Sequence, residues 1–438
     1  MSQLLERNVY CQNETDYEEL NAEKHPWKES LKVVNKDYLI KRGVNLDNID
    51  SDVLRIVEDA SLKAIQDFSQ LGGRPPLLRY GHRLQTVMAP IPSNLKIEKH
   101  CNCDECPTYI KEVIPSQPGC QINCQYCLSV ANTAIQTKVR IYENYAEWFR
   151  KQLSINRVQN KDEFGKLYYW SPKTEALSPE MVELGIAQEI LCAFEDHVIE
   201  EQKRLGGRCP DTLLVITKAG KQELSTKGPD GKTILELMRR IPDNIQVCGS
   251  VNYLNYNKQL REALEPGARP AEDRFEFLRI LQKNNIQASG LLFQPIFAPF
   301  IPDESYFRML TETVGIQKMH IDILTSNIRS LAVVMQIVGW YYPEAEKQMW
   351  DLYLPQEGPE KGGNRRSIAE KMQKEIIEGT INSARKVGVQ NFTYCRFTQK
   401  AVGLPPRPEK EECMSYITPT PENIRKSRQN QLFSPGKD

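Results

Sequence analysis

The sequence predicts an α/β fold, a partial (β/α)6 barrel open on one side, with a helical N-terminal and a mixed C-terminal extension. Short β-branched or aromatic segments alternate with amphipathic helical segments between residues 109 and 324. This alternation indicates right-handed βαβ units around a parallel sheet. The 438 residues are too many for one small domain but suit an α/β barrel with extensions. A cysteine-rich loop directly follows the first predicted strand, at the end of such barrels where function is found.

The predicted elements divide the chain into three parts. The barrel strands cover residues 109–114, 166–171, 212–218, 245–252, 286–297 and 317–324. The helices between them cover residues 142–155, 179–202, 233–241, 274–284 and 305–314. We therefore predict an N-terminal helical extension at residues 1–105, the barrel at residues 106–330, and a C-terminal extension with a tail at residues 331–438.

Both extensions contain predicted helices. In residues 51–70 apolar side chains such as Val57 and Phe68 recur at helical spacing, and Ser51 or Asp52 is a candidate cap. Further helices are predicted at residues 331–340 and 367–387, a candidate extra strand at 391–397, and a Pro-rich surface tail from residue 403.

Composition argues against several classes of protein. Lys+Arg and Asp+Glu both number 57, so the formal net charge is zero, whereas duplex DNA-binding proteins usually carry a positive excess. No run approaches the ~20 apolar residues that a membrane-spanning helix needs. The polar, acidic N-terminus is unlike a secretory signal, and twelve cysteines without such a signal indicate reduced thiols and metal ligation. We expect a cytoplasmic protein that contacts neither membranes nor nucleic acid.

Residues 118–127, PGCQINCQYC, carry Cys120, Cys124 and Cys127 at C-x3-C-x2-C spacing. A loop led by Pro and Gly can bring three thiolates onto one soft metal centre. Four cysteines would ligate every iron of a four-iron cluster, so three leave one iron open for chemistry. The alternatives are a structural zinc site and buried free thiols, although zinc sites usually show two separated pairs of ligands.

A second set of cysteines, Cys101, Cys103 and Cys106, lies shortly before this loop at C-x-C-x2-C spacing. It is a candidate for an auxiliary iron–sulfur cluster or a zinc ion. The candidate fourth ligands are distant: His100, Cys209, Cys395 and Cys413. The alternative is a set of exposed reduced thiols.

Polar side chains also follow four consecutive predicted strands. Ser171, Thr174 and Glu175 follow the second strand, Lys218 the third, Ser250 and Asn252 the fourth, and Gln294 lies near the end of the fifth. Each one alone would be explained by a cap, a turn or a surface contact. Because the carboxyl ends of parallel strands meet at one edge of a barrel, we expect them to form one site.

The cysteine loop, with Tyr126 just before its last cysteine, resembles the radical S-adenosylmethionine (AdoMet) superfamily. In that superfamily three cysteines hold a [4Fe-4S] cluster, whose open iron binds the amino and carboxylate groups of AdoMet. An electron then cleaves AdoMet to methionine and a 5′-deoxyadenosyl radical. The superfamily also uses a partial barrel open on one side.

Further motifs are similar to the spore photoproduct lyase branch of this superfamily, over residues 109–300, about half of the chain. They are Tyr142-Glu143-Asn144, the Ser171–Glu175 turn, Thr217-Lys218, Ser250-Val251-Asn252, and Glu265-Pro266-Gly267-Ala268-Arg269 before Arg274. The resemblance implies Cys120, Cys124 and Cys127 as cluster ligands. The expected AdoMet contacts are Tyr126, Asn144, Ser171, Thr174, Lys218, Ser250, Asn252 and Gln294.

One departure from that branch concerns the hydrogen donor. Its DNA-repair members use a cysteine near the end of the second strand, where this chain reads Tyr168-Tyr169-Trp170-Ser171. Tyr169 is therefore the candidate hydrogen donor and Glu175 a second catalytic candidate, and DNA-lesion repair is disfavoured.

We expect a radical AdoMet enzyme (a lyase, dehydratase, epimerase or related enzyme) that takes one hydrogen from a small metabolite. A sugar, an aminocyclitol or a natural-product intermediate is the expected substrate, and a flavodoxin- or ferredoxin-type protein the expected electron donor. Candidate substrate contacts are Glu175, Tyr253, Gln294, His320 and Asp322. The alternatives are radical modification of a peptide, a DNA photoproduct lyase, and a non-catalytic zinc-stabilised binding protein.

Overall fold

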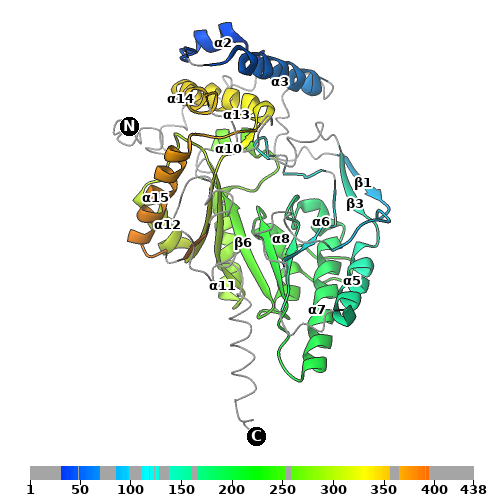
Figure 1. Cartoon of the computed structure of the whole chain (residues 1–438). Helices are drawn as coiled ribbons and strands as arrows, with labels where there is room; N and C mark the ends of the chain where they lie inside the picture. The colour runs from blue at the N-terminus through cyan, green and yellow to red at the C-terminus, as the bar shows by residue number, and fades with distance from the viewer. Residues whose placement is uncertain are drawn as a thin grey trace.

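The computed structural model describes residues 31–47, 49–69, 85–97, 110–117, 119–122, 124–127, 138–159, 165–252, 258–355, 365–389 and 391–393. At its centre is a seven-stranded sheet in the order β11-β8-β7-β6-β5-β4-β2, and every neighbouring pair is parallel. Figure 1 shows helices packed around this twisted sheet. Within the described part of the chain β2 and β11 do not pair with each other, so the barrel is open.

All six predicted barrel strands form, in the predicted order, and the α/β partial-barrel fold is confirmed. They are β2 (Ile110–Val113), β4 (Leu167–Trp170), β5 (Thr212–Thr217), β6 (Ile245–Val251), β7 (Gln287–Ile296) and β8 (Lys318–Ile323). The candidate strand near the C-terminus also forms, as β11 (Asn391–Thr393), and pairs with β8. The C-terminal extension therefore contributes one strand to the barrel sheet.

The five helices predicted for the barrel layer form with changed bounds, and two short helices that were not predicted, at Lys221–Ser225 and Lys258–Leu264, join them. Together they are α5 (Tyr145–Gln159), α6 (Pro179–Glu183), α7 (Ile186–Leu205), α8 (Lys221–Ser225), α9 (Ile234–Met238), α10 (Lys258–Leu264), α11 (Ala271–Lys283) and α12 (Glu304–Val314). The helix predicted over 179–202 is divided at Gly185, whose φ of +79° is a conformation that glycine adopts readily. Tyr142 belongs to a strand instead of starting a helix: β3 (Lys138–Tyr142) pairs in parallel with β1 (Gln85–Ala89).

Side chains of β4 alternate between the helical layer and the barrel interior. Tyr168 packs edge-on against Phe149 of α5 and Phe194 of α7, with ring centroids 6.0 and 5.8 Å apart. Because neighbouring residues of a strand point to opposite faces, Tyr169 faces the interior. Glu112 of β2 and Leu214 of β5 pair in register with Tyr169, so these three side chains form a row that faces the interior.

The N-terminal helices pack against two helices that follow the barrel strands. In Figure 1, α2 (Lys36–Lys41) and α3 (Ser51–Ser69) lie over α13 (Ile328–Tyr341) and α14 (Pro343–Tyr353). Gln336 Oε1 accepts from Lys32 N at 2.8 Å, and Gln336 Nε2 donates to Lys32 O at 3.2 Å. The Tyr38 hydroxyl donates to Glu346 Oε1 at 2.6 Å. These contacts join the two predicted extensions, so the division at residues 105 and 330 stays a prediction.

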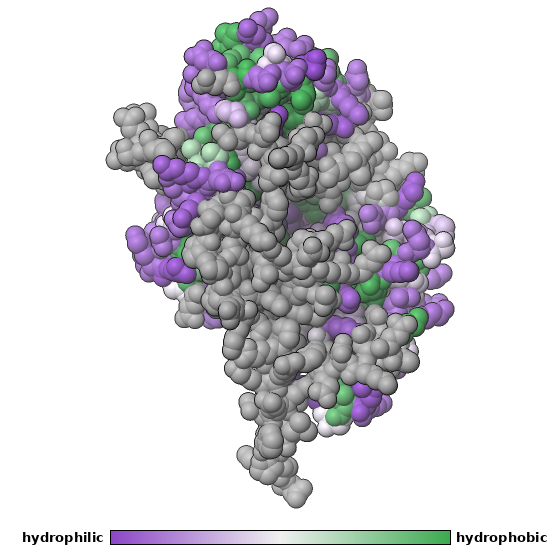
Figure 2. Space-filling model, in the orientation of Figure 1, coloured by the Kyte–Doolittle hydropathy of each residue, from purple (hydrophilic) through white to green (hydrophobic). Residues whose placement is uncertain are grey.

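The rest of the C-terminal part comprises α15 (Glu370–Lys386) and the short antiparallel pair β9 (Ser326–Asn327) and β10 (Arg365–Arg366). On the face drawn in Figure 2 the described surface is mostly hydrophilic, and hydrophobic atoms gather mainly at the top, over α2 and α3. Ile40 and Leu62 on these helices are 54% and 38% exposed. None of the described helices combines the length and apolar character needed to cross a bilayer.

Candidate active site

The cysteine loop lies at the C-terminal edge of the sheet, directly after β2. Two backbone hydrogen bonds dock it on the end of α10 and the segment after it: Gln125 N donates to Leu264 O at 2.9 Å, and Gly267 N donates to Ile122 O at 3.1 Å. A Cβ atom on Gly267 would overlap the carbonyl oxygen of Gln121. The close approach therefore requires glycine at this position, and the Glu-Pro-Gly-Ala stretch supports the loop.

We expect replacement of Gly267 by alanine to displace this loop. Overlap with backbone atoms cannot be relieved by a side-chain rotation, and overpacking of this kind costs about 1–3 kcal/mol. Iron bound per chain after anaerobic reconstitution should fall, together with the free energy of unfolding in urea. The matched control is Gly379→Ala in α15, where no described atom lies within 4 Å of the added Cβ. That variant should keep its iron and gain up to about 1 kcal/mol of helix stability; equal behaviour of the two variants would contradict the docking argument.

The three cysteines of the loop lie close to one another. Cys124 is 8% exposed, and Cys120 and Cys127 are partly buried. Burial raises the pKa of the Cys124 thiol well above its usual value, Lys218 lowers it, and Glu265 and the two other cysteines raise it. A thiol of this kind keeps its proton until a metal displaces it.

The donor set of the loop consists of three thiols. Thiolates are the ligands that hold the irons of iron–sulfur clusters, and they also bind zinc.

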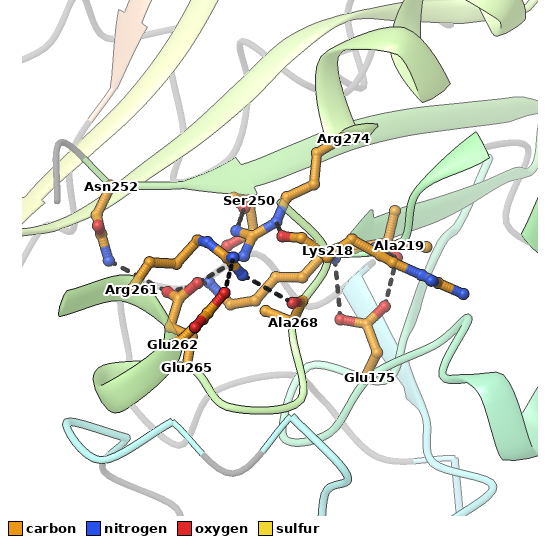
Figure 3. A network of polar contacts seen from close by, with 12 residues as sticks. Glu175, Lys218, Ala219, Ser250, Asn252, Arg261, Glu262, Glu265, Ala268 and Arg274 are labelled. Carbon is orange, nitrogen blue, oxygen red and sulfur yellow. Dashed lines mark hydrogen bonds and ion pairs between the residues drawn. The ribbon is translucent and has the colours of Figure 1, made fainter. Parts of the chain in front are cut away.

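Glu265 is the centre of a buried network beside this loop (Figure 3). Its carboxylate is fully buried. Oε1 accepts from Lys218 Nζ at 2.9 Å, from Asn252 Nδ2 at 3.1 Å and from the Tyr126 hydroxyl, and Oε2 accepts from Arg274 Nη2 at 2.7 Å. Burial alone raises the pKa of Glu265, but Lys218 and Arg274 outweigh burial and hold that pKa well below its usual value. The carboxylate is therefore ionised.

Arg274 connects this network to the surrounding backbone. It projects from α11 and is fully buried. Its Nη1 donates to Ser250 O at 2.7 Å, and its Nε donates to Arg269 O at 2.7 Å. One guanidinium thus fixes the end of β6 and the stretch that supports the cysteine loop.

Glu175 is a second buried carboxylate, at the other side of the view in Figure 3. It accepts from the Thr217 hydroxyl, from Lys218 N at 3.0 Å and from Leu177 N at 3.3 Å. Burial raises the pKa of Glu175, and these hydrogen bonds lower it. All three donors belong to the protein, and they tie the turn after β4 to the end of β5.

Ser171 has the features of a ligand-binding residue. It ends β4 with a φ of +56°, a left-handed conformation that non-glycine residues adopt at a cost. Its side chain is buried, and its hydroxyl has no hydrogen-bond partner among the described residues. Such an unsatisfied group costs about 1–3 kcal/mol, which a bound polar ligand would offset.

The other residues predicted for the site are placed as follows. Thr174 lies beside Ser171, and its hydroxyl accepts from Ser116 Oγ at 3.3 Å. Gln294 lies in β7 and is half-buried. Asn144 is exposed before α5, and no hydrogen bond or ion pair between described residues joins it to the Glu265 network. Tyr253 and the set Cys101, Cys103 and Cys106 lie outside the described residues.

The inward face of the sheet is unusually polar. Besides Tyr169 and Glu112, this face carries Ser250 of β6 and His320 of β8. Both pair in register with Leu292 of β7, which lies between them. Glu112, Ser250 and His320 are each buried. Barrel interiors that serve only as a core are filled by branched apolar side chains, so this face is suited to a polar ligand.

The structure brings together several residues predicted for the site: the three loop cysteines, Tyr126, Lys218 and Asn252. The residue that joins the last three, Glu265, was not predicted from the sequence. Glu265 and Arg274 appeared only as parts of a motif, with no function attached to either side chain. No clear sequence signal marks this pair, because both residues stand among other charged side chains of α10 and α11, such as Glu262, Glu272 and Asp273. Its partners on other strands could not be identified without the fold.

Comparisons with known proteins found similarity in structure alone. No protein-family model and no curated protein matches the sequence. Two solved structures of spore photoproduct lyase mutants each have 13% identity and a TM-score of 0.49. The matches cover 78% and 79% of this chain, and 95% and 97% of those chains. A radical S-adenosylmethionine methyltransferase, TsrM, from Kitasatospora setae, with cobalamin and a [4Fe-4S] cluster bound, has 11% identity and a TM-score of 0.38. That match covers 73% of this chain and 61% of the methyltransferase chain.

Proposed function

We propose that this chain is a radical AdoMet enzyme, in which Cys120, Cys124 and Cys127 hold a [4Fe-4S] cluster. The observation that carries the proposal is the docked loop. It brings three thiols together at the C-terminal edge of a parallel sheet, beside the Glu265 network and the Ser171 hydroxyl, for which the described residues provide no partner. When bound, the cluster supplies an open iron for AdoMet and the electron that cleaves it to methionine and a 5′-deoxyadenosyl radical.

The protein's own contribution is to bind, orient and exclude water. In this proposal the Ser171 hydroxyl accepts a hydrogen bond from the AdoMet ammonium group, with Thr174 next to it. Lys218 faces the AdoMet carboxylate. Glu265 holds the ammonium group of Lys218 in place, with Oε1 2.9 Å from Nζ. The Tyr126 ring lies edge-on to Phe297, with centroids 5.4 Å apart, and this pair gives the site an apolar wall.

The proposed substrate is a small polar metabolite such as a sugar or an aminocyclitol. Support comes from the inward row of polar side chains, because a pocket with a few convergent polar groups favours a polar ligand over an apolar one. Tyr169 faces this interior. In this proposal its phenolic O–H group is the hydrogen donor to the product radical, as expected from the sequence. Glu175, whose three contacts are to protein groups, is better assigned as a positioning residue for the ends of β4 and β5.

The electron must come from outside the chain. We propose a flavodoxin- or ferredoxin-type donor and a reducing, cytoplasmic setting, in keeping with cysteines that are kept as thiols.

Anaerobic reconstitution followed by metal analysis and an AdoMet cleavage assay tests the proposal. We expect about four iron and four sulfide per chain, and formation of 5′-deoxyadenosine from AdoMet by the dithionite-reduced protein. About eight of each would place a second cluster at Cys101, Cys103 and Cys106 and would favour the peptide-modification alternative. Protein that takes up zinc but no iron under these conditions would rule out the enzyme and leave the zinc-stabilised binding protein.

A further inference from the structure

A second group of metal-ligand side chains lies at the opposite edge of the sheet. His197 is in α7, and Cys209 and Asp211 precede β5, which begins at Thr212. All three are buried, and their ligand atoms lie within 4.8 Å of one another. The cysteine loop is at the carboxyl ends of the strands, so this group is separate from the candidate active site.

We propose that His197, Cys209 and Asp211 bind one Zn²⁺ ion. Imidazole nitrogen, thiolate sulfur and carboxylate oxygen form a donor set typical of zinc, a borderline-soft ion without a geometric preference of its own. His197 Nε2 and Asp211 Oδ2 are now 2.7 Å apart and share a hydrogen bond. Ligands of tetrahedral zinc stand about 3.3–3.8 Å apart, so a shift of roughly half an ångström lets the ion replace the shared proton.

The surrounding contacts hold these three groups in place. Asp211 Oδ1 accepts from Lys166 N at 2.7 Å, which leaves Oδ2 to face His197. Asn244 Nδ2 donates to Cys209 O at 2.9 Å and to Asp211 O at 2.7 Å, and so fixes the short segment that carries both ligands. Supporting hydrogen bonds of this kind orient the ligands of protein metal sites.

The imidazole is held on its other side by aromatic rings. Tyr168 packs edge-on against the His197 ring at a centroid distance of 6.1 Å, and Phe194 packs against it at 5.7 Å. Apolar packing around a metal ligand restricts its rotation and limits the access of solvent.

An ion can reach this site from solvent. His197 also lines a surface depression of about 500 Å³ between α5 and α7. Glu201, one turn further along α7, is buried, but it pairs with Arg204 at 2.5 Å and is not among the groups within the 4.8 Å limit. We therefore assign the fourth position to water from the depression.

The proposed zinc has a structural role, because it would join the C-terminal half of α7 to the start of β5. It lies at the N-terminal edge of the strands, which in barrel enzymes contributes to stability and not to catalysis. Zinc in the purified protein would therefore accompany the iron of the active site and would not argue against it.

Metal content of matched cysteine variants tests the proposal. Protein is equilibrated with Zn²⁺, dialysed, and analysed for zinc and iron by mass spectrometry. We expect Cys209→Ser to hold about one zinc per chain less than the wild type. The control is Cys192→Ser, at a half-buried cysteine on α7, the helix that carries His197, and it should hold the wild-type amount. Iron per chain should be equal in all three proteins, which separates this test from the test of the cluster.

Cobalt gives a second readout on the same proteins. Co²⁺ bound to a thiolate gives a near-ultraviolet charge-transfer band, which should appear with the wild type and Cys192→Ser and be absent from Cys209→Ser. If Cys209→Ser does not fold by circular dichroism, Asp211→Asn replaces it, because the amide oxygen can still accept from Lys166 N while the carboxylate ligand is lost. Equal zinc content in the wild type and the ligand variants, or no zinc uptake by the wild type, would overturn the proposal.

Discussion

Replacing Cys124 by alanine is expected to abolish the formation of 5′-deoxyadenosine and to remove most of the bound iron. Cys124 is the most buried of the three loop cysteines, and without it two irons of the cluster lack a protein ligand. Loss of a residue that merely supports a metal ligand costs 10–100-fold in affinity or activity, so loss of a ligand should cost more than ~100-fold. The measurement is 5′-deoxyadenosine per chain from the dithionite-reduced, reconstituted protein.

The control for this variant is Cys192→Ala. Cys192 is half-buried on α7, and the charged groups that act on it, such as Lys232 and Asp230, do not belong to the loop, so its loss should leave iron content and AdoMet cleavage unchanged. Full activity in Cys124→Ala would refute the assignment of the cluster ligands. Loss of activity with full iron content would instead indicate that the thiol acts on AdoMet and not on the metal.

Replacing Arg274 by methionine is expected to destabilise the protein by about 3–5 kcal/mol, the usual cost of removing one partner from a buried ion pair. Glu265 would keep a buried negative charge with Lys218 as its remaining cationic partner. The carbonyl oxygens of Ser250 and Arg269 would each lose a donor, which adds to the cost. The measurement is the free energy of unfolding in urea, made without metal and under anaerobic conditions.

Two comparisons make this prediction specific. Arg308→Met removes two exposed pairs, with Glu304 at 2.7 Å and with Glu312 at 3.8 Å, and should cost at most about 1 kcal/mol. Glu265→Gln alone should also be strongly destabilising, because Lys218 and Arg274 would both lose the carboxylate with which they pair. If Arg274→Met costs no more than Arg308→Met, the Glu265 network does not hold the site together.

The barrel could be predicted because its signals are local. The β-branched strands and the helices between them each show their period within about ten residues, and a sheet with strands in sequence order follows from right-handed crossovers. The pairing of β1 with β3 could not be predicted in this way, because the two strands are separated by the cysteine-rich segments. The break between α6 and α7 depends on one residue, Gly185, whose left-handed conformation is set by its surroundings.

Those residues of the candidate site that belong to a sequence motif could be predicted. The spacing of the three cysteines and the polar residues at the strand ends are visible in the sequence. The contacts that organise them are not, because Tyr126 and Glu265 are 139 positions apart and Lys218 and Glu265 are 47 apart. The same holds for His197 and Asp211, which come together only because α7 runs back along the sheet and returns to β5.

The packing of the first helices on α13 has a consequence for synthesis of the chain. Lys32 and Gln336 are 304 positions apart, and a ribosome adds about 5–20 residues per second. The N-terminal helices therefore wait about 15–60 s before their partner has been translated. During that time the apolar side chains of α3 that α13 will cover remain open to other contacts. A nascent chain interrupted before residue 341 would never bury them.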